Sequence, residues 1–200
     1  MEILLISYPT YFNGEIDLIH NMFDEGLTVF HLRKPDYNEN QLTEFLDRIK
    51  PEFHSRIKVH STFLGFFNRF MLGGIHIPGA ISVNSNIINL KKDKNISISS
   101  SFHSFDEAIR DNEHFDYAFL SPVFDSISKK NYKSRFDFNE LSKVLAQANI
   151  RLIALGGCKA ENLNQVKQLG FSGAAVLGAV WNSADPFNSY IEIKDAAAGL

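Results

Sequence analysis

The sequence contains very little cysteine and no long apolar segment. Cys158 is the single cysteine among 200 residues, which excludes an intrachain disulfide and a cysteine-based zinc site. No apolar run approaches the ~20 residues that a membrane-spanning helix needs, and the first apolar segment begins almost at Met1 without the basic region of a signal peptide. We therefore expect a cytoplasmic protein that does not associate with a membrane.

The chain also lacks a strong charge of either sign. It has 20 Lys and Arg against 23 Asp and Glu, a formal net charge of −3 and a pI near 6.2. No run of like charges suggests a tail, and no basic patch predicts nucleic-acid binding. With 44% hydrophobic residues, the chain can bury a sizeable core.

Short apolar runs alternate with helical patterns along the whole chain. Apolar runs of this kind are typical of strands buried in a parallel sheet. We predict eight strands, at 2–8, 27–32, 56–60, 73–77, 96–101, 115–120, 150–157 and 173–178. We predict helices at 14–25, 39–50, 66–70, 105–110, 139–148, 161–169 and 179–193. Residues 78–94 are irregular and rich in Asn and Ser, and we expect a loop there with at most a short helix.

This alternation predicts an α/β fold, a single-domain (β/α)8 TIM barrel over residues 1–194. A doubly wound open sheet is the alternative. We expect residues 195–200 to form a mobile tail. The sequence does not give the oligomeric state, for which a homodimer is one candidate.

In a barrel, chemistry belongs at the carboxyl ends of the strands. The polar residues predicted there are His31, Arg33, His60, His76, Ser101, His103, Ser121, Ser126, Ser128 and Lys129. The histidines come from different strands, without a paired helical motif or an accompanying carboxylate, so we predict no metal site. An imidazole at a strand end can exchange protons with a ligand near neutral pH, although His103 could instead cap the next helix or lie in the core.

The last two predicted strands each end in glycine before a helix. Glycine lets a backbone approach a ligand closely, and the following helix directs unpaired N–H groups toward the same point. We therefore predict a phosphate site formed by Gly156, Gly157, Leu177 and Gly178. Tight turns are the alternative explanation for these glycines. The cationic residues Lys129, Lys130, Lys133 and Arg135 form either a solvated loop or a lid over a phosphate.

Several blocks together resemble the thiamine phosphate synthases and their relatives, the TenI-type thiazole tautomerases. The segment Phe115-Asp-Tyr-Ala-Phe-Leu-Ser-Pro-Val-Phe124, followed by Ser126, Ser128 and Lys129, resembles the family's ADYxxxGPVFxTxTK. His31-Leu-Arg33 resembles QLR, Gly74-Ile-His-Ile77 resembles GVHL, and Ser101-Phe-His103 resembles SxH. Ala154-Leu-Gly-Gly157 and Gly173 to Gly178 resemble the IGGI and final phosphate blocks. The resemblance implies a TIM barrel that acts on thiazole phosphate in thiamine synthesis.

The departures from these blocks concern the magnesium ion that the synthase reaction requires. The family's Asn-Asp pair after the third strand is replaced by His60-Ser61, and the Asp after GVHL by Ala80-Ile81. Hard Mg²⁺ therefore loses its carboxylate ligands. The family has a basic residue two positions after the arginine of QLR; here that position is Pro35, and the neighbouring Lys34 is a candidate substitute. In the loop, Ser126 and Ser128 replace the two threonines and keep their hydroxyl groups.

A tautomerase requires less, namely a phosphate anchor and a positioned acid–base group. The resemblance implies His103 as the catalytic residue and Arg33 as the group that binds a substrate carboxylate through paired hydrogen bonds. It implies His31, Ser101, Ser126, Ser128 and Lys129 as further substrate-binding residues. We predict a metal-independent thiazole tautomerase with a small-molecule phosphate substrate and no cofactor. The alternatives are a thiamine phosphate synthase, which would need Mg²⁺, and a non-catalytic barrel that binds phosphate ligands.

Overall fold

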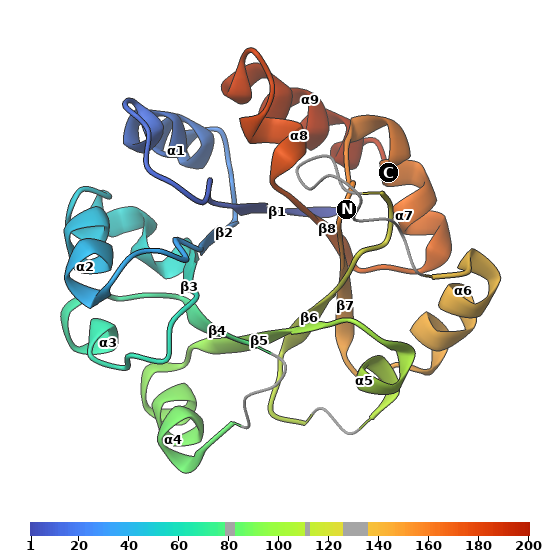
Figure 1. Ribbon diagram of the computed structural model, residues 1–200, viewed down its shortest axis with the longest axis horizontal. Helices are drawn as coiled ribbons and strands as arrows, with labels where there is room; N and C mark the ends of the chain where they lie inside the picture. Colours follow the sequence, from blue (N-terminus) through green and yellow to red (C-terminus); the bar gives the residue numbers. More distant parts are fainter. Residues whose placement is uncertain (79–82, 111–112, 126–135) are drawn as a thin grey trace.

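The computed structural model describes residues 1–78, 83–110, 113–125 and 136–200. Eight parallel strands form a closed barrel in which each strand pairs with its neighbours in sequence order and β8 pairs with β1 (Figure 1). The strands are β1 Glu2–Ile6, β2 Val29–Leu32, β3 Ile57–Val59, β4 Gly74–Pro78, β5 Ser97–Phe102, β6 Tyr117–Leu120, β7 Arg151–Leu155 and β8 Gly173–Val176. This is the predicted (β/α)8 TIM barrel, and the open-sheet alternative is excluded.

Helices surround the barrel on its outside (Figure 1). They are α1 Glu15–Asp24, α2 Glu39–Asp47, α3 Phe66–Arg69, α4 Ser85–Lys94, α5 Phe105–Ile109, α6 Phe138–Gln147, α7 Leu163–Leu169, α8 Gly178–Trp181 and α9 Pro186–Ala198. Two short 3₁₀ helices, Pro51–Arg56 and Ala160–Asn162, precede β3 and α7. Within the described parts of the chain, no helix combines the length and the apolar character needed to cross a bilayer.

Local sequence explains where several of these helices begin. The Asn38 side chain accepts a hydrogen bond from the backbone N–H of Gln41, and the Gln41 side chain accepts one from the N–H of Asn38. Ser104 and Glu107 form the same reciprocal pair at α5, as the spacing predicts. Such caps satisfy N–H groups that a helix cannot pair internally.

Most predicted ends are within a few residues of those observed, and the larger differences concern the helices. The helix expected at 179–193 is divided into α8 and α9, because Asp185 caps a new helix whose first residue is Pro186. The irregular segment contains the ten-residue helix α4, capped by Asn84. Helix α9 continues through Ala198, beyond the predicted boundary at 194. Ala197 is buried, and its carbonyl accepts a hydrogen bond of 2.8 Å from the Met1 amino group.

The core has two parts. The larger part lies between the barrel and its helices and contains most of the buried aliphatic and phenylalanine side chains. A smaller part fills the barrel interior, with Leu4, Ile6, Tyr117, Phe119, Ile153 and Ala175. Since a TIM-barrel interior is normally packed with branched apolar side chains, the histidines that lie against Phe119 on the described strands form an unusual feature.

Candidate functional site

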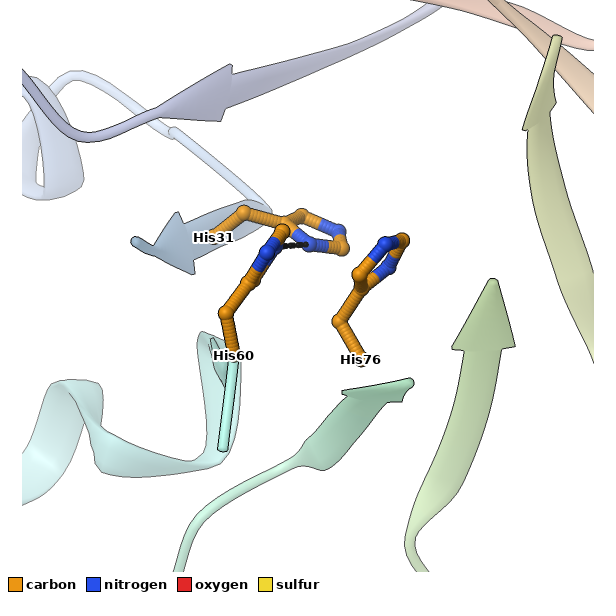
Figure 2. A group of neighbouring side chains, drawn as sticks. All are labelled: His31, His60 and His76. Atoms are coloured by element: carbon orange, nitrogen blue, oxygen red, sulfur yellow. Dashed lines mark hydrogen bonds between the residues drawn. The ribbon is translucent and has the colours of Figure 1, made fainter. Parts of the chain in front are cut away.

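Three histidines from consecutive strands meet inside the barrel (Figure 2). His31 lies in β2, His60 directly follows β3, and His76 lies in β4. The Nδ1 atom of His31 is 2.9 Å from Nε2 of His60, and the rings of His60 and His76 stack with centroids 4.0 Å apart. We call this group the histidine cluster. The sequence prediction placed these residues at one mouth, and the structure brings them into contact.

Neighbouring side chains hold the rings of the histidine cluster. The Nε2 atom of His31 lies 2.7 Å from the Tyr117 hydroxyl. The Nδ1 and Nε2 atoms of His76 each lie 2.9 Å from a serine hydroxyl, of Ser99 and Ser101 respectively. These serines face the same side of β5 because strand side chains alternate. Ser101 therefore lies at the site, as predicted, but its hydroxyl contacts a protein side chain.

Burial determines the charge of the histidine cluster. It lowers the pKa of His31 and of His60 well below the usual value. It also lowers the pKa of His76 to about 3, and the positive charge of Arg33 adds to this effect. Because the charged form of each ring is disfavoured, all three imidazoles are neutral at neutral pH. Each therefore has one nitrogen lone pair that can accept a hydrogen bond or bind a metal ion.

A cavity of about 880 Å³ opens beside the histidine cluster. Its lining includes His60 and His76 together with Arg33, whose side chain is exposed. Of the described residues that line it, Glu39 alone carries a carboxylate. The cavity is thus large enough for a small molecule and presents a cation to it.

Lys34 also lines this cavity, but it is held in a buried ion pair. Its Nζ atom lies 2.6 Å from Oε1 of Glu15, and neither side chain is exposed. Nζ also donates to the carbonyl of Thr10. The buried carboxylate of Glu15 already pairs with its charge, which argues against the suggestion that Lys34 replaces the family's basic residue.

His103 lies apart from the histidine cluster, directly after β5. Its Nδ1 atom is 3.1 Å from the carbonyl oxygen of Ser121 and 3.2 Å from the Ser121 hydroxyl. Its backbone N–H donates to the Glu107 carboxylate. The side chain is exposed, so the alternative of a core position is excluded. In the tautomer that donates Nδ1–H to this carbonyl, Nε2 is available as an acid–base atom.

The predicted phosphate residues lie at the carboxyl ends of the adjacent strands β7 and β8. Gly156 and Gly157 have φ values of +96° and +66°. A Cβ atom on Gly157 would lie 2.4 Å from the carbonyl oxygen of Asp125. The segment after β6 passes so close to residue 157 that only glycine fits there. Phosphate binding is not needed to explain this glycine. Leu177 is the N-cap residue of α8, and Gly178 is its first residue.

Three predicted substrate-binding residues, Ser126, Ser128 and Lys129, lie outside the described residues. The side chains that help to build the site but were not predicted include Ser99, Glu15 and Tyr117. Glu15 was expected only as part of a helix, and Tyr117 as part of a buried strand. The signal for Tyr117 was its hydroxyl group, since a buried tyrosine needs a hydrogen-bond partner.

A sequence profile of the thiamine monophosphate synthase family, which includes TenI, matches residues 4–180. The chain belongs to this family. A thiamine-phosphate synthase of Desulfitobacterium hafniense is 25% identical over 175 residues, covering 84% of this chain and 82% of the relative. One of Clostridium botulinum is 25% identical over 191 residues, covering 92% of each. The members of this thiamine phosphate synthase/TenI family are enzymes of thiamine biosynthesis.

Solved structures agree with the family assignment. A thiamine phosphate pyrophosphorylase of Bacteroides thetaiotaomicron superposes with a TM-score of 0.78 at 29% identity and covers 99% of this chain and 98% of its own. One of Pyrococcus furiosus gives a TM-score of 0.79 at 17% identity, covering 99% and 96%. At that lower identity the likeness concerns the fold.

Among the described residues, the donor atom at the position after β3 does not suit the Mg²⁺ ion of a synthase. Magnesium prefers oxygen ligands, usually one or two carboxylates together with substrate phosphates. At the position after β3 the chain presents the His60 imidazole, which stacks on His76. Ala80 and Ile81, which replace the second carboxylate position, lie outside the described residues.

Proposed function

We propose that this family member is a thiazole tautomerase that transfers a proton within a thiazole carboxylate phosphate. The observation that carries the proposal is the position of His103, whose Nδ1 is engaged by the carbonyl of Ser121. Because a carbonyl oxygen only accepts hydrogen bonds, this contact favours the tautomer with the proton on Nδ1. In that tautomer Nε2 can remove a proton from the exocyclic tautomer of the substrate and return it at another carbon. Substrate and product are isomers, so the reaction consumes no co-reactant.

Arg33 is the proposed partner of the substrate carboxylate. Its side chain is exposed at the edge of the cavity, and its backbone is fixed by two hydrogen bonds with Ser7, of 2.8 and 2.9 Å. A guanidinium group binds a carboxylate through two parallel hydrogen bonds. The backbone around Gly156, Gly157, Leu177 and Gly178 is the proposed phosphate anchor.

A thiamine phosphate synthase is the second candidate, and the names of the sequence relatives favour it. Its reaction releases diphosphate, which needs cationic stabilisation from Mg²⁺. The unsuitable donor atoms at His60 argue against this candidate. A barrel that binds phosphate ligands without turnover is the third.

Parallel assays of purified protein distinguish the three candidates. One assay follows isomerisation of the thiazole carboxylate phosphate tautomer, and the other follows diphosphate release from thiazole phosphate and pyrimidine diphosphate, each with and without added Mg²⁺. We expect Mg²⁺-independent isomerisation that His103→Ala reduces by about 10² to 10⁴-fold, the usual contribution of general acid–base catalysis. His114→Ala is the matched control, because His114 is an exposed histidine before β6, at the opposite end of the barrel. Mg²⁺-dependent diphosphate release would establish the synthase instead, and no turnover in either assay would favour the binding protein.

A further inference from the structure

The histidine cluster has the geometry of a metal site. His31, His60 and His76 each offer one ring nitrogen, and these three atoms all lie within 4.8 Å of one another. Figure 2 shows the three rings gathered side by side from neighbouring strands, with the rings of His60 and His76 stacked. A tetrahedral zinc ion with Zn–N distances of about 2.0–2.1 Å separates its ligand nitrogens by roughly 3.4 Å. The stacked rings of His60 and His76 must rotate about their side-chain bonds to reach that geometry.

A metal ion can bind only if the nitrogens that face it carry no proton. A shift of one proton within the hydrogen bonds of His31 achieves this. His31 Nδ1 and His60 Nε2, 2.9 Å apart, share a single proton. If His31 moves that proton to Nε2, it can donate it to the Tyr117 oxygen, which lies 2.7 Å away. Both facing nitrogens then carry lone pairs, and the number of protons in the cluster is unchanged.

The surroundings of the rings are those of a second coordination shell. A histidine ligand normally donates its other ring N–H to a nearby acceptor, which fixes its orientation. Tyr117 provides this acceptor for His31, and the Ser99 or Ser101 hydroxyl provides it for His76. Phe119 packs against both rings, with centroids 4.7 Å from His31 and 5.1 Å from His76. The rings of His31 and His76 therefore have these contacts before any ion binds.

We propose that the histidine cluster binds one divalent transition-metal ion, of which zinc is the best fit, through three imidazole nitrogens. Neutral imidazole suits zinc and related ions, whereas magnesium requires oxygen. His60 and His76 line the cavity, so the fourth coordination position faces it. Arg33 lines the same cavity and favours an anionic fourth ligand, such as a carboxylate or phosphate.

This proposal departs from the sequence-based expectation of no metal site, and it is independent of the proposed tautomerase. His103 is not a member of the cluster. A protein without isomerase activity could therefore still bind the ion, and the two proposals fail separately.

Metal binding is tested with untagged protein that has been stripped with a chelator and then titrated with Zn²⁺ or Co²⁺. We expect uptake of about one ion per chain and, for Co²⁺, the visible absorption of a tetrahedral site. At a free Zn²⁺ concentration 100-fold above Kd, Tm should rise by about 5 °C or more. Failure of the wild-type protein to take up a stoichiometric ion would overturn the proposal.

Variants separate the cluster from surface histidines. His31→Gln, His60→Gln and His76→Gln should each weaken binding at least about 100-fold, whereas His114→Gln should leave it unchanged. Tyr117→Phe keeps all three ligands but removes the acceptor for His31, and should weaken binding by about 10 to 100-fold. Circular dichroism confirms which variants fold. Equal uptake by folded wild-type and cluster variants would show binding elsewhere and would overturn the proposal.

Discussion

The Nζ atom of Lys34 lies 2.6 Å from Oε1 and 2.7 Å from Oε2 of Glu15, and both side chains are completely buried. This pair joins the start of α1 to the segment after β2. Burial raises the pKa of Glu15 and lowers the pKa of Lys34, in each case against the effect of the partner's charge. Each charge therefore depends on the other to remain in the interior.

Removing one member of this ion pair should destabilise the fold much more than removing both. We expect Lys34→Met to lower the free energy of unfolding by about 3–5 kcal/mol, because Glu15 would be left without its buried countercharge. The double variant Lys34→Met/Glu15→Leu should recover most of that loss. Urea unfolding of the three proteins measures the difference.

An exposed ion pair is the matched control for that experiment. Lys194 and Glu25 lie 3.1 Å apart with partly exposed side chains, and Lys194→Met should cost less than about 1 kcal/mol. If Lys34→Met were as mild as Lys194→Met, the buried pair would have no special role.

Substitution of Arg33 should affect substrate binding more than turnover. In the tautomerase, Arg33→Met should raise KM about 10 to 100-fold with little change in kcat, because binding of the carboxylate is lost equally from substrate and transition state. Arg151→Met is the control, since Arg151 begins β7 at the opposite end of the barrel. A comparable fall in kcat and unchanged KM for Arg33→Met would contradict this role.

Cys158 should make the protein less stable in alkali. Burial raises the pKa of its thiol from about 9 to about 12. Between these values the unfolded thiol loses its proton while the folded thiol keeps it, so the unfolded state binds fewer protons and stability falls as pH rises. We expect a contribution of about 1.4 kcal/mol per pH unit from this group.

Comparison with Cys158→Ala isolates that contribution from tyrosines that titrate in the same range. The difference in unfolding free energy between wild type and Cys158→Ala should be constant below pH 8.5 or so and should change with roughly the stated slope above it. Parallel stability curves up to pH 11 or so would show that the thiol ionises equally in both states.

The glycine at 157 should be far less replaceable than the glycine at 26. Both have positive φ, +66° and +96° respectively. A Cβ atom on Gly26 meets nothing within 4 Å, whereas one on Gly157 would overlap the Asp125 carbonyl. We expect Gly26→Ala to cost about 1–2 kcal/mol from the backbone alone, and Gly157→Ala to cost at least about 2 kcal/mol more.

Thermal unfolding compares these two glycine variants. Activity assays of folded Gly157→Ala then test the phosphate anchor, for which a raised KM for the phosphate substrate is expected. Equal losses of stability in the two variants would show that the segment after β6 moves away without cost.

The barrel could be predicted from sequence because its strands are short apolar runs at regular intervals. The same reasoning failed for α4, which buries only Ile87 and therefore lacks an apolar periodicity. Hydrophobic periodicity also predicted one helix where the structure has α8 and α9, although the pair Asp185-Pro186 carries the usual signals of a helix start. Local capping chemistry is more informative at these places than hydrophobicity.

The sequence predicted which histidines lie at the site, but it did not predict how their side chains contact one another. Strand ends identify His31, His60 and His76 as neighbours of one mouth, because parallel strands share their carboxyl edge. Whether three rings from different strands come within hydrogen-bonding distance depends on the stagger of the barrel and on ring rotamers. Neither quantity is encoded in residue spacing, so the sequence could place the three histidines at one mouth but could not predict that their rings are in contact.

The hydrogen bond between the Met1 amino group and the carbonyl of Ala197 has a practical consequence for engineering. It brings the two ends of the chain together beside the β1–β8 pairing. A short linker across them, with new ends opened between a helix and the following strand, would give a circular permutant in which every strand keeps both neighbours. The order in which the strands are synthesised can then be changed while the barrel itself stays the same.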